Sequence, residues 1–160
     1  MAENKSYRVE VSYLDGVKDA TGDIITRDIA DIGVPGVEGV RKSAIYIISG
    51  ELDLRAVEEI CGKLLADPVV ERYTIDEVES GKAVCGDREH KIDVFLKKGV
   101  TDTVGDSVRF GISDLGIKGV EGVKTGAGYC LKGNLSKENV YRVCQQLLAN
   151  SVIHDYSIKK

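Results

Sequence analysis

The five residues GVEGV occur twice in the chain, at 36–40 and at 119–123, and each run holds a glutamate between glycines. A basic residue follows each run, Arg41 after the first and Lys124 after the second. Glycine-rich runs bind phosphate when they lie between a strand and the amino-terminal end of a helix, where backbone N–H groups are free. The same glycines can instead end a helix and begin a strand.

The elements before the first run favour the second interpretation. A helix is expected to begin after Asp19, whose short carboxylate suits the N-cap position. Its apolar stripe consists of Ile25, Ile29 and Ile32. Gly33 follows the last apolar residue, where a left-handed residue often ends a helix. The order is then helix, glycines, strand, the reverse of a phosphate loop. Gly22 lies on the stripe and predicts either a close backbone approach or a helix that begins later.

The chain is a tandem duplication. Residues 8–75 align without a gap on residues 91–158, an offset of 83, with 26 identities in 68 positions. Such internal similarity indicates two copies of one structural unit. We therefore divide the chain into a first repeat at 1–79, a linker at 80–89 and a second repeat at 90–160.

Each repeat has the same expected order of elements. A half-buried strand at 7–13 precedes the helix, and a long apolar stretch at 40–50 follows it, as one bent strand or as two strands around Lys42 and Ser43. A second helix is expected after Asp53 or Ser136, and Pro68 is expected to stop it in the first repeat. A final strand closes the unit.

This pattern predicts an α+β fold of two tandem two-layer α/β sandwich units, each β-α-β(β)-α-β with both helices on one sheet face. In the long strand, Tyr46 and Ile48 are apolar on one side and Ile45 and Ile47 on the other. A strand that is apolar on both sides needs cover on both sides. The other repeat is the simplest source of that cover, so we expect the two sheets to pack as a pseudo-two-fold, single-chain equivalent of a dimer.

Composition and charge exclude several classes. No apolar run reaches 18 residues, and no basic cluster with interleaved aromatics occurs, so we expect neither a membrane span nor nucleic-acid binding. Residues 1–79 carry 9 Lys and Arg against 17 Asp and Glu, whereas residues 90–160 carry 11 against 7. The two repeats therefore differ in charge, at −8 and +4.

The cysteines and histidines do not form a recognisable reactive set. Cys61 and Cys144 lie on the expected buried stripe of the second helix, where a thiol packs as a small hydrophobe, and Cys85 and Cys130 have no partner at metal-ligand spacing. We expect reduced thiols, no metal, no cofactor and a cytoplasmic protein. His90 and His154, which are the two histidines, are not repeated and are expected to be solvated strand residues.

The segments GVEGVR at 36–41 and LLADPVVERY at 64–73, with the helices and the tyrosine-bearing strand between them, resemble the PurS family. The resemblance covers both repeats. It implies a small, non-catalytic subunit of phosphoribosylformylglycinamidine (FGAM) synthase in purine biosynthesis. Such subunits bridge the ATP-dependent synthetase subunit (PurL-like) and the glutaminase subunit (PurQ-like), so that ammonia reaches the substrate FGAR.

Six residues are the candidates for contact with a partner or substrate: Glu38, Arg41, Tyr46, Glu121, Lys124 and Tyr129. Glutamates between glycines and a fork-shaped guanidinium suit polar contacts, and tyrosines often anchor interfaces, although core packing is the alternative for both tyrosines. No catalytic residue is proposed.

The second repeat departs from the first at places that suggest different partners for the two halves. Arg41 becomes Lys124, which cannot copy bidentate geometry. Asp67-Pro68 becomes Asn150-Ser151, and Glu71 becomes His154.

Two other functional classes stay open. Paired units of this kind resemble ACT-like modules, which sense small molecules between units, and tight amino-acid binding by the isolated chain would favour that class. A self-sufficient small enzyme would need a matched acid, base or metal set, which the sequence does not display.

Overall fold

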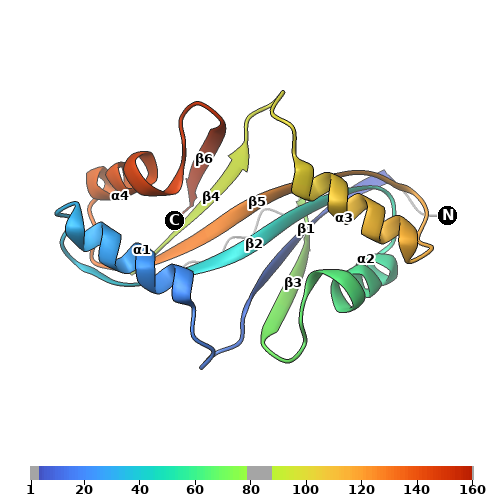
Figure 1. Ribbon diagram of the computed structural model, residues 1–160, viewed down its shortest axis with the longest axis horizontal. Coiled ribbons are helices and arrows are strands. Elements are labelled where there is room, and N and C mark those ends of the chain that lie inside the picture. The colour runs from blue at the N-terminus through green and yellow to red at the C-terminus, as the bar shows by residue number, and fades with distance from the viewer. Residues whose placement is uncertain (1–3, 79–87, 160) are drawn as a thin grey trace. The chain divides into compact units, whose positions relative to one another are not determined.

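The computed structural model describes residues 4–78 and 88–159 (Figure 1). The first repeat forms, in order, β1 (Asn4–Tyr13), α1 (Ala20–Asp31), β2 (Val37–Glu51), α2 (Leu54–Ile60), the π-helix η1 (Cys61–Leu65) and β3 (Glu71–Glu77). The second forms β4 (Glu89–Leu96), α3 (Thr103–Asp114), β5 (Val120–Gly133), α4 (Lys137–Val143), the π-helix η3 (Cys144–Leu148) and β6 (His154–Lys159). The predicted α+β class and the repeated order of elements are confirmed.

The strands follow one hydrogen-bonded order, β3-β1-β2-β5-β4-β6. β1 is antiparallel to β2 and β3, and β4 is antiparallel to β6. The two long strands, β2 with 15 residues and β5 with 14, are neighbours at the centre of this order. The structure thus differs from the separate sheet per repeat that the sequence favours, because the long strand of each repeat pairs with that of the other.

The chain forms two compact units, and each contains segments of both repeats. The first unit consists of Met1–Val17, Ala44–Gly81 and Thr101–Gly126, and the second of Lys18–Ser43, Lys82–Val100 and Ala127–Lys160. The exchange points lie inside β2 and β5, each of which is one continuous strand. The first unit therefore combines β1, α2 and β3 of the first repeat with α3, the first helix of the second repeat. The second unit combines β4, α4 and β6 of the second repeat with α1, the first helix of the first repeat.

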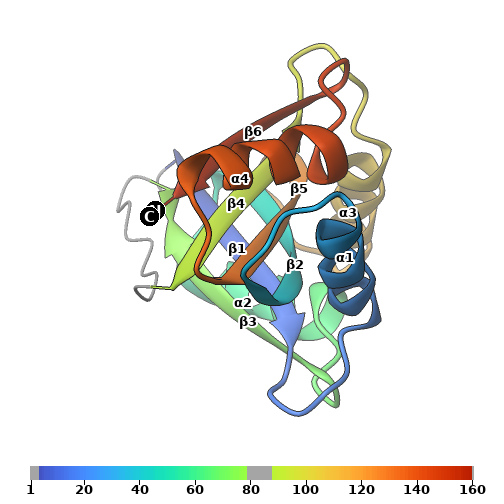
Figure 2. The same ribbon diagram turned by 90° about the vertical axis from the view of Figure 1, so that its left-hand side faces the viewer.

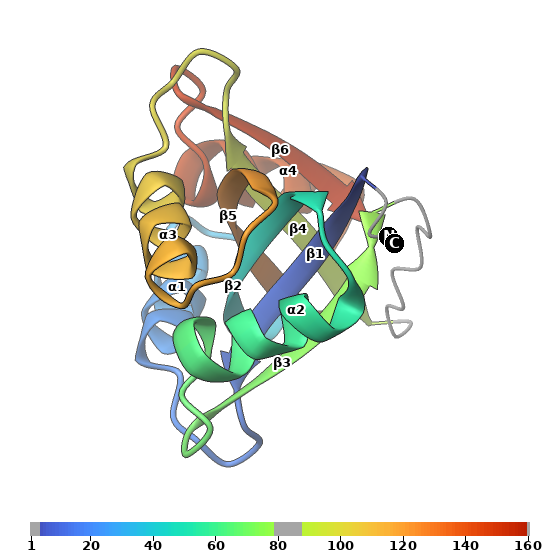
Figure 3. The same cartoon turned by 90° about the vertical axis from the view of Figure 1, so that its right-hand side faces the viewer.

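The core of the first unit shows this exchange directly. Its buried side chains from the first repeat are Tyr7, Val9, Val11, Ile48, Leu52, Val57, Ile60 and Cys61. Ile112 of α3, which is 1% exposed, joins them from the second repeat, and Val108 packs against the cluster. Figure 3 shows α3 and α2 of this unit with β1 and β3. The apolar stripe of α3 therefore covers strands of the repeat to which it does not belong.

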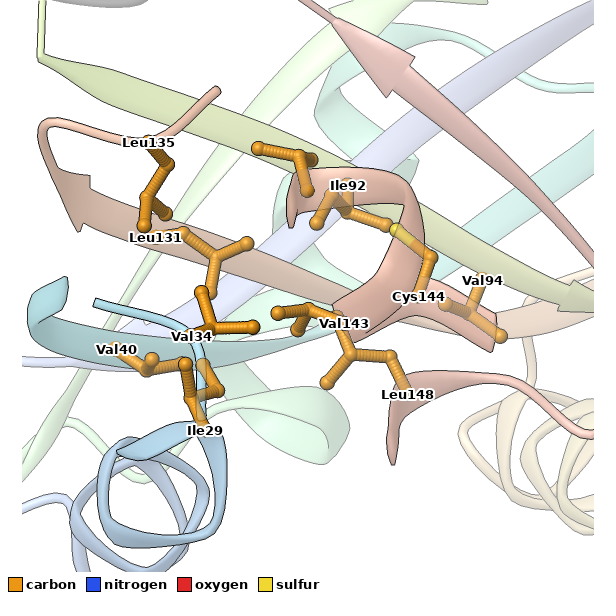
Figure 4. Close-up of a cluster of buried hydrophobic side chains, with 11 residues drawn as sticks. Ile29, Val34, Val40, Ile92, Val94, Leu131, Leu135, Val143, Cys144 and Leu148 are labelled. Carbon is orange, nitrogen blue, oxygen red and sulfur yellow. The ribbon is translucent and has the colours of Figure 1, made fainter. Parts of the chain in front are cut away.

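The second unit has the matching core (Figure 4). Ile29 of α1, with Val34 and Val40, lies among side chains of the second repeat. Those side chains are Ile92, Val94, Leu131, Leu135, Val140, Val143, Cys144 and Leu148. Figure 2 shows α1 and α4, the helices of this unit. Arg142 of α4 donates to the carbonyl of Ile32 at the carboxyl end of α1, where a cation is favoured by the helix dipole.

Both first helices begin at the predicted N-caps, and these caps also tie the helices to the long strands. The carboxylate of Asp19 accepts the N–H of Gly22 at 2.8 Å and that of Lys42, in β2, at 2.8 Å. Asp102 accepts the N–H of Gly105 at 2.8 Å and, in β5, the N–H and hydroxyl of Thr125, each at 2.7 Å. One aspartate per unit thus fixes both the start of a helix and its position on the sheet.

The helical glycines mark a close approach of two backbones. A Cβ built on Gly22 would lie 2.1 Å from the carbonyl oxygen of Val40, and one on Gly105 would lie 2.5 Å from that of Val123. α1 begins at Ala20, before Gly22, so the alternative of a later helix start is wrong. Any side chain here would push the helix off its strand.

The second helices end in a wider turn in both repeats. The N–H of Ala66 donates to the carbonyl of Cys61 at 3.0 Å, and that of Ala149 to Cys144 at 2.9 Å, the spacing of a π-helix. Both alanines are extended, at φ −120° and −128°. The first of these helices ends before Pro68, as expected, and the second ends at the matched residue without a proline, so a proline is not required for this ending.

Candidate functional site

The GVEGV runs begin the long strands just beyond a helix end. Gly33 and Gly116 have φ of +84° and +80°, the left-handed conformation predicted for them after α1 and α3. The runs then lead directly into β2 and β5. The order is helix, glycine, strand, so the free N–H groups of a helix start are not available to bind a phosphate. The C-cap and strand-entry interpretation is confirmed.

The first glycine of each run has a further role that sequence reasoning missed. A Cβ on Gly36 would lie 2.4 Å from the carbonyl oxygen of Asn134, and one on Gly119 would lie 2.5 Å from that of Glu51. Asn134 also donates its N–H to Gly36 at 3.2 Å, and Glu51 to Gly119 at 2.9 Å. Each run therefore fits against the strand end of the other repeat. The signal in the sequence was the perfect repetition of the run, which the need for two matching contacts explains.

The two candidate glutamates are exposed and already make contacts within the chain. Glu38 pairs with Arg88 at 2.8 Å, with 46% of the glutamate side chain and 59% of the arginine side chain exposed. Glu121 accepts a hydrogen bond from the side-chain amide of Asn4 at 3.3 Å. Exposed contacts of this kind contribute little to stability, so both carboxylates can exchange them for a partner at low cost.

The two candidate tyrosines are half-buried and line the cores. Tyr46 packs against the core of the first unit and Tyr129 against that of the second. Burial raises the pKa of both phenols, and the charge of Glu71 raises that of Tyr46 further. The ammonium of Lys42 lies 5.9 Å from the ring centroid of Tyr129, within range of a cation–π contact.

The six candidate residues are divided between the two units. The first unit contains Tyr46, Glu121 and Lys124, and the second contains Glu38, Arg41 and Tyr129. Arg41 and Lys124 are exposed on β2 and β5. The exchange between repeats thus places the tyrosine of one repeat in the same unit as the GVEGV run of the other, which the alignment alone could not show.

The thiols of Cys61 and Cys144 are buried in the two cores. Burial raises the pKa of Cys61 and of Cys144 to about 12, and the charge of Glu58 contributes to the shift at Cys61. Both residues are 0% exposed, as predicted for core side chains. Cys130 is partly buried, and Cys85 lies outside the described residues. Among the residues that the structure describes, no group of three His, Cys, Asp or Glu could hold a metal ion.

The two histidines differ in their surroundings: His90 is buried, and His154 accepts a hydrogen bond in a turn. His90 is 7% exposed, so the expectation of a solvated residue is wrong. It takes the position of Tyr7 in the first repeat, on the core side of the strand. His154 accepts the N–H of Asn150 at its Nδ1, at 3.0 Å, just as Glu71 accepts that of Asp67 at 2.9 Å. The change from glutamate to histidine therefore preserves the turn before the last strand.

The family model of PurS, described as phosphoribosylformylglycinamidine (FGAM) synthase, matches residues 6–79 and again residues 89–160. The chain belongs to the PurS family. The resemblance seen in the sequence is thereby confirmed for both repeats.

One relative matches a stretch of the chain about as long as a single repeat. The FGAM synthase subunit PurS of Methanocaldococcus jannaschii is 39% identical over 69 residues, which cover 40% of this chain and 83% of that protein. The crystal structure of M. jannaschii PurS, titled as one of the subunits of formylglycinamide ribonucleotide amidotransferase, has 31% sequence identity and a TM-score of 0.33. It covers 44% of this chain and 92% of the M. jannaschii chain. Within residues 4–78 and 88–159, no helix is long and apolar enough to cross a membrane.

Proposed function

We propose that this chain is the non-catalytic assembly subunit of FGAM synthase, bridging the ATP-dependent synthetase subunit and the glutaminase subunit so that ammonia reaches FGAR. The observation that carries the proposal is the match of the PurS family model to both repeats. The burial of Cys61 and Cys144 and the hydrogen bond of His154 within its turn agree with a subunit that supplies contacts rather than chemistry. We also propose a cytoplasmic location, supported by cysteine spacings that are not typical of a disulfide framework.

The test is reconstitution of the enzyme. The full chain is mixed with the purified synthetase and glutaminase subunits from the same source, and glutamine-dependent FGAM formation is measured with and without it. We expect omission to abolish this activity while ammonia-dependent activity of the synthetase subunit falls less. Equal glutamine-dependent rates in both mixtures would refute the proposal.

We further propose that the two units contact different partners. The structure explains some of the sequence differences that suggested this, but the difference in charge remains. Two of the differences between the repeats preserve hydrogen bonds of the turn before the last strand. Asn150 accepts the N–H of Val152 at 3.0 Å as Asp67 accepts that of Val69 at 3.0 Å, and His154 replaces Glu71 in the same turn. These changes therefore do not argue for different partners.

The charge difference does support different partners, because it persists when the charges are counted by unit. The first unit holds 8 Lys and Arg against 16 Asp and Glu, a net charge of −8. The second holds 14 against 10, a net charge of +4. Opposite charge favours different partner surfaces and different salt dependence. Alanine scanning of matched surfaces on both units tests this, and loss of the same partner from matched positions would refute it.

A further inference from the structure

The exposed face of α3, in the first unit, carries an aromatic side chain between two carboxylates. Phe110 is 74% exposed. Asp106 and Asp114 are exposed four residues before and after it, and residues four apart share one face of a helix. Within residues 4–78 and 88–159, neither carboxylate forms an ion pair, not even with Arg109, the nearest cation along the helix. The face thus presents exposed apolar area and negative charge that is not neutralised by an ion pair.

The matched face of α1, in the second unit, carries a cation in place of the aromatic side chain. Arg27 takes the place of Phe110 and stands between Asp23 and Asp31 at the same spacing. A cation four residues from each carboxylate suits a solvated helix face. The second repeat keeps both carboxylates but replaces the cation with a phenyl ring. Asp114 also ends α3, where the helix dipole disfavours a negative charge.

A second apolar side chain lies next to this face. Leu64 of η1 is 39% exposed and lies over α3 at Gly111, where a built Cβ would be 2.9 Å from Leu64 Cδ1. The matched residues of the second unit are Leu147, which is packed against its core, and Asp28 in place of the glycine. Phe110 and Leu64 therefore give the α3 face two exposed apolar side chains, whereas α1 holds Arg27 and Asp28 at the positions matched to Phe110 and Gly111.

We propose that this α3 face, formed by Asp106, Phe110, Asp114 and Leu64, docks a partner protein that presents an apolar pocket between two cationic side chains. The rise of a helix places each carboxylate about 6 Å along the axis from Phe110, so the two cations lie about 12 Å apart. The first unit's net charge of −8 favours such a basic surface. The inference rests on the proposed function, since the partner is one subunit of the same enzyme.

The test compares the full chain with matched variants for binding to each purified FGAM synthase subunit, by titration calorimetry. Phe110→Arg copies the residue of the second unit, and Arg27→Ala is the control on the matched face. We expect Phe110→Arg to weaken the affinity for one subunit by at least about 30-fold, as for aromatic hot spots, and to leave the other unchanged. Arg27→Ala should change neither by more than about twofold. The double change Asp106→Asn with Asp114→Asn should weaken the same subunit about tenfold and reduce its salt dependence.

The outcomes separate this inference from the proposed function. If Phe110→Arg binds both subunits as tightly as the unaltered chain, the docking surface is refuted and the proposed function stands. If the unaltered chain binds neither subunit, both are refuted. Sedimentation of the chain alone identifies a second copy as the occupant if the unaltered chain dimerises and Phe110→Arg does not, and that result also overturns the proposal. Thermal unfolding confirms that each variant is folded.

Discussion

Replacing Gly22 with alanine tests whether α1 is held against β2 by the absence of a side chain. The new Cβ would lie 2.1 Å from the carbonyl oxygen of Val40, a distance at which a shift is unavoidable. The obstructing atom is backbone, so it cannot rotate away. The helix must move away from β2, and this movement also strains the bonds from Asp19 to the N–H groups of Gly22 and Lys42.

The expected cost follows from three contributions. Overpacking costs about 1–3 kcal/mol, and a weakened N-cap costs about 1 kcal/mol. The preference of a helix for alanine over glycine returns about 0.5–1 kcal/mol. The free energy of unfolding should therefore fall by about 1–3.5 kcal/mol, which lowers Tm by about 2–14 °C in a chain of this size.

Thermal unfolding followed by circular dichroism measures this effect, and Gly62→Ala provides the control. Gly62 is an exposed residue of η1, and a Cβ built on it meets no atom within 4 Å. Its replacement should raise stability by about 0.5–1 kcal/mol. If Gly22→Ala were as stable as Gly62→Ala, the close approach of α1 to β2 would not constrain the fold as argued.

Three further predictions concern single groups. Asp102→Ala removes the acceptor of two backbone N–H groups and a threonine hydroxyl, so urea unfolding should show a loss of about 1–2 kcal/mol, with partial recovery in Asp102→Asn. Glu71→Ala and His154→Ala should each lower the free energy of unfolding by about 1 kcal/mol in the same urea measurement, because each removes the acceptor of a turn. Glu71→His and His154→Glu should lower it much less, because each keeps an acceptor for its turn. Equal losses from both kinds of change would contradict this. Cys61 and Cys144 should resist iodoacetamide at pH 8 in the folded chain and react in denaturant, because their pKa of about 12 keeps the thiols neutral in the folded state. The free energy of unfolding should decline from about pH 9 to pH 12, because the thiols of the unfolded chain ionise first. This decline should shrink when both cysteines are replaced by alanine.

Features that depend on neighbouring residues in the sequence were predictable. Asp19 caps α1, Gly33 ends it in the left-handed conformation, and Gly22 marks a close approach. The first two follow from the backbone of one helix turn, and the third follows from the presence of a glycine on an apolar helix stripe, although its contact, Val40, lies further along the chain. The apolar faces of β2 were also predictable, since Ile45 and Ile48 lie on opposite sides and are both 0% exposed. Local periodicity and glycine chemistry suffice for such features.

The exchange between repeats was not predictable, because the two copies have nearly the same apolar stripes. Ile29 and Ile112 occupy matched positions, and either could fill the core of its own repeat or that of the other. Nothing in a single sequence distinguishes the two pairings. The environment of His90 was missed for a related reason: its burial depends on the strand's register, which places it where Tyr7 lies in the first repeat.

The duplication allows the surface residues of the two copies to change independently, whereas the matched close contacts inside the fold must be kept in both. In a symmetric pair of identical chains, every surface residue appears twice, so a patch suited to one partner is also present where another partner binds. Joining two copies in one chain removes this constraint, while the matched close contacts at Gly36 and Gly119 must still be kept in both. The positions that changed agree with this reasoning: Glu71 and His154 differ but fill the same structural role, whereas Arg27 and Phe110 differ in charge, polarity and size on exposed helix faces. Differences of the second kind are the ones to test first for partner choice.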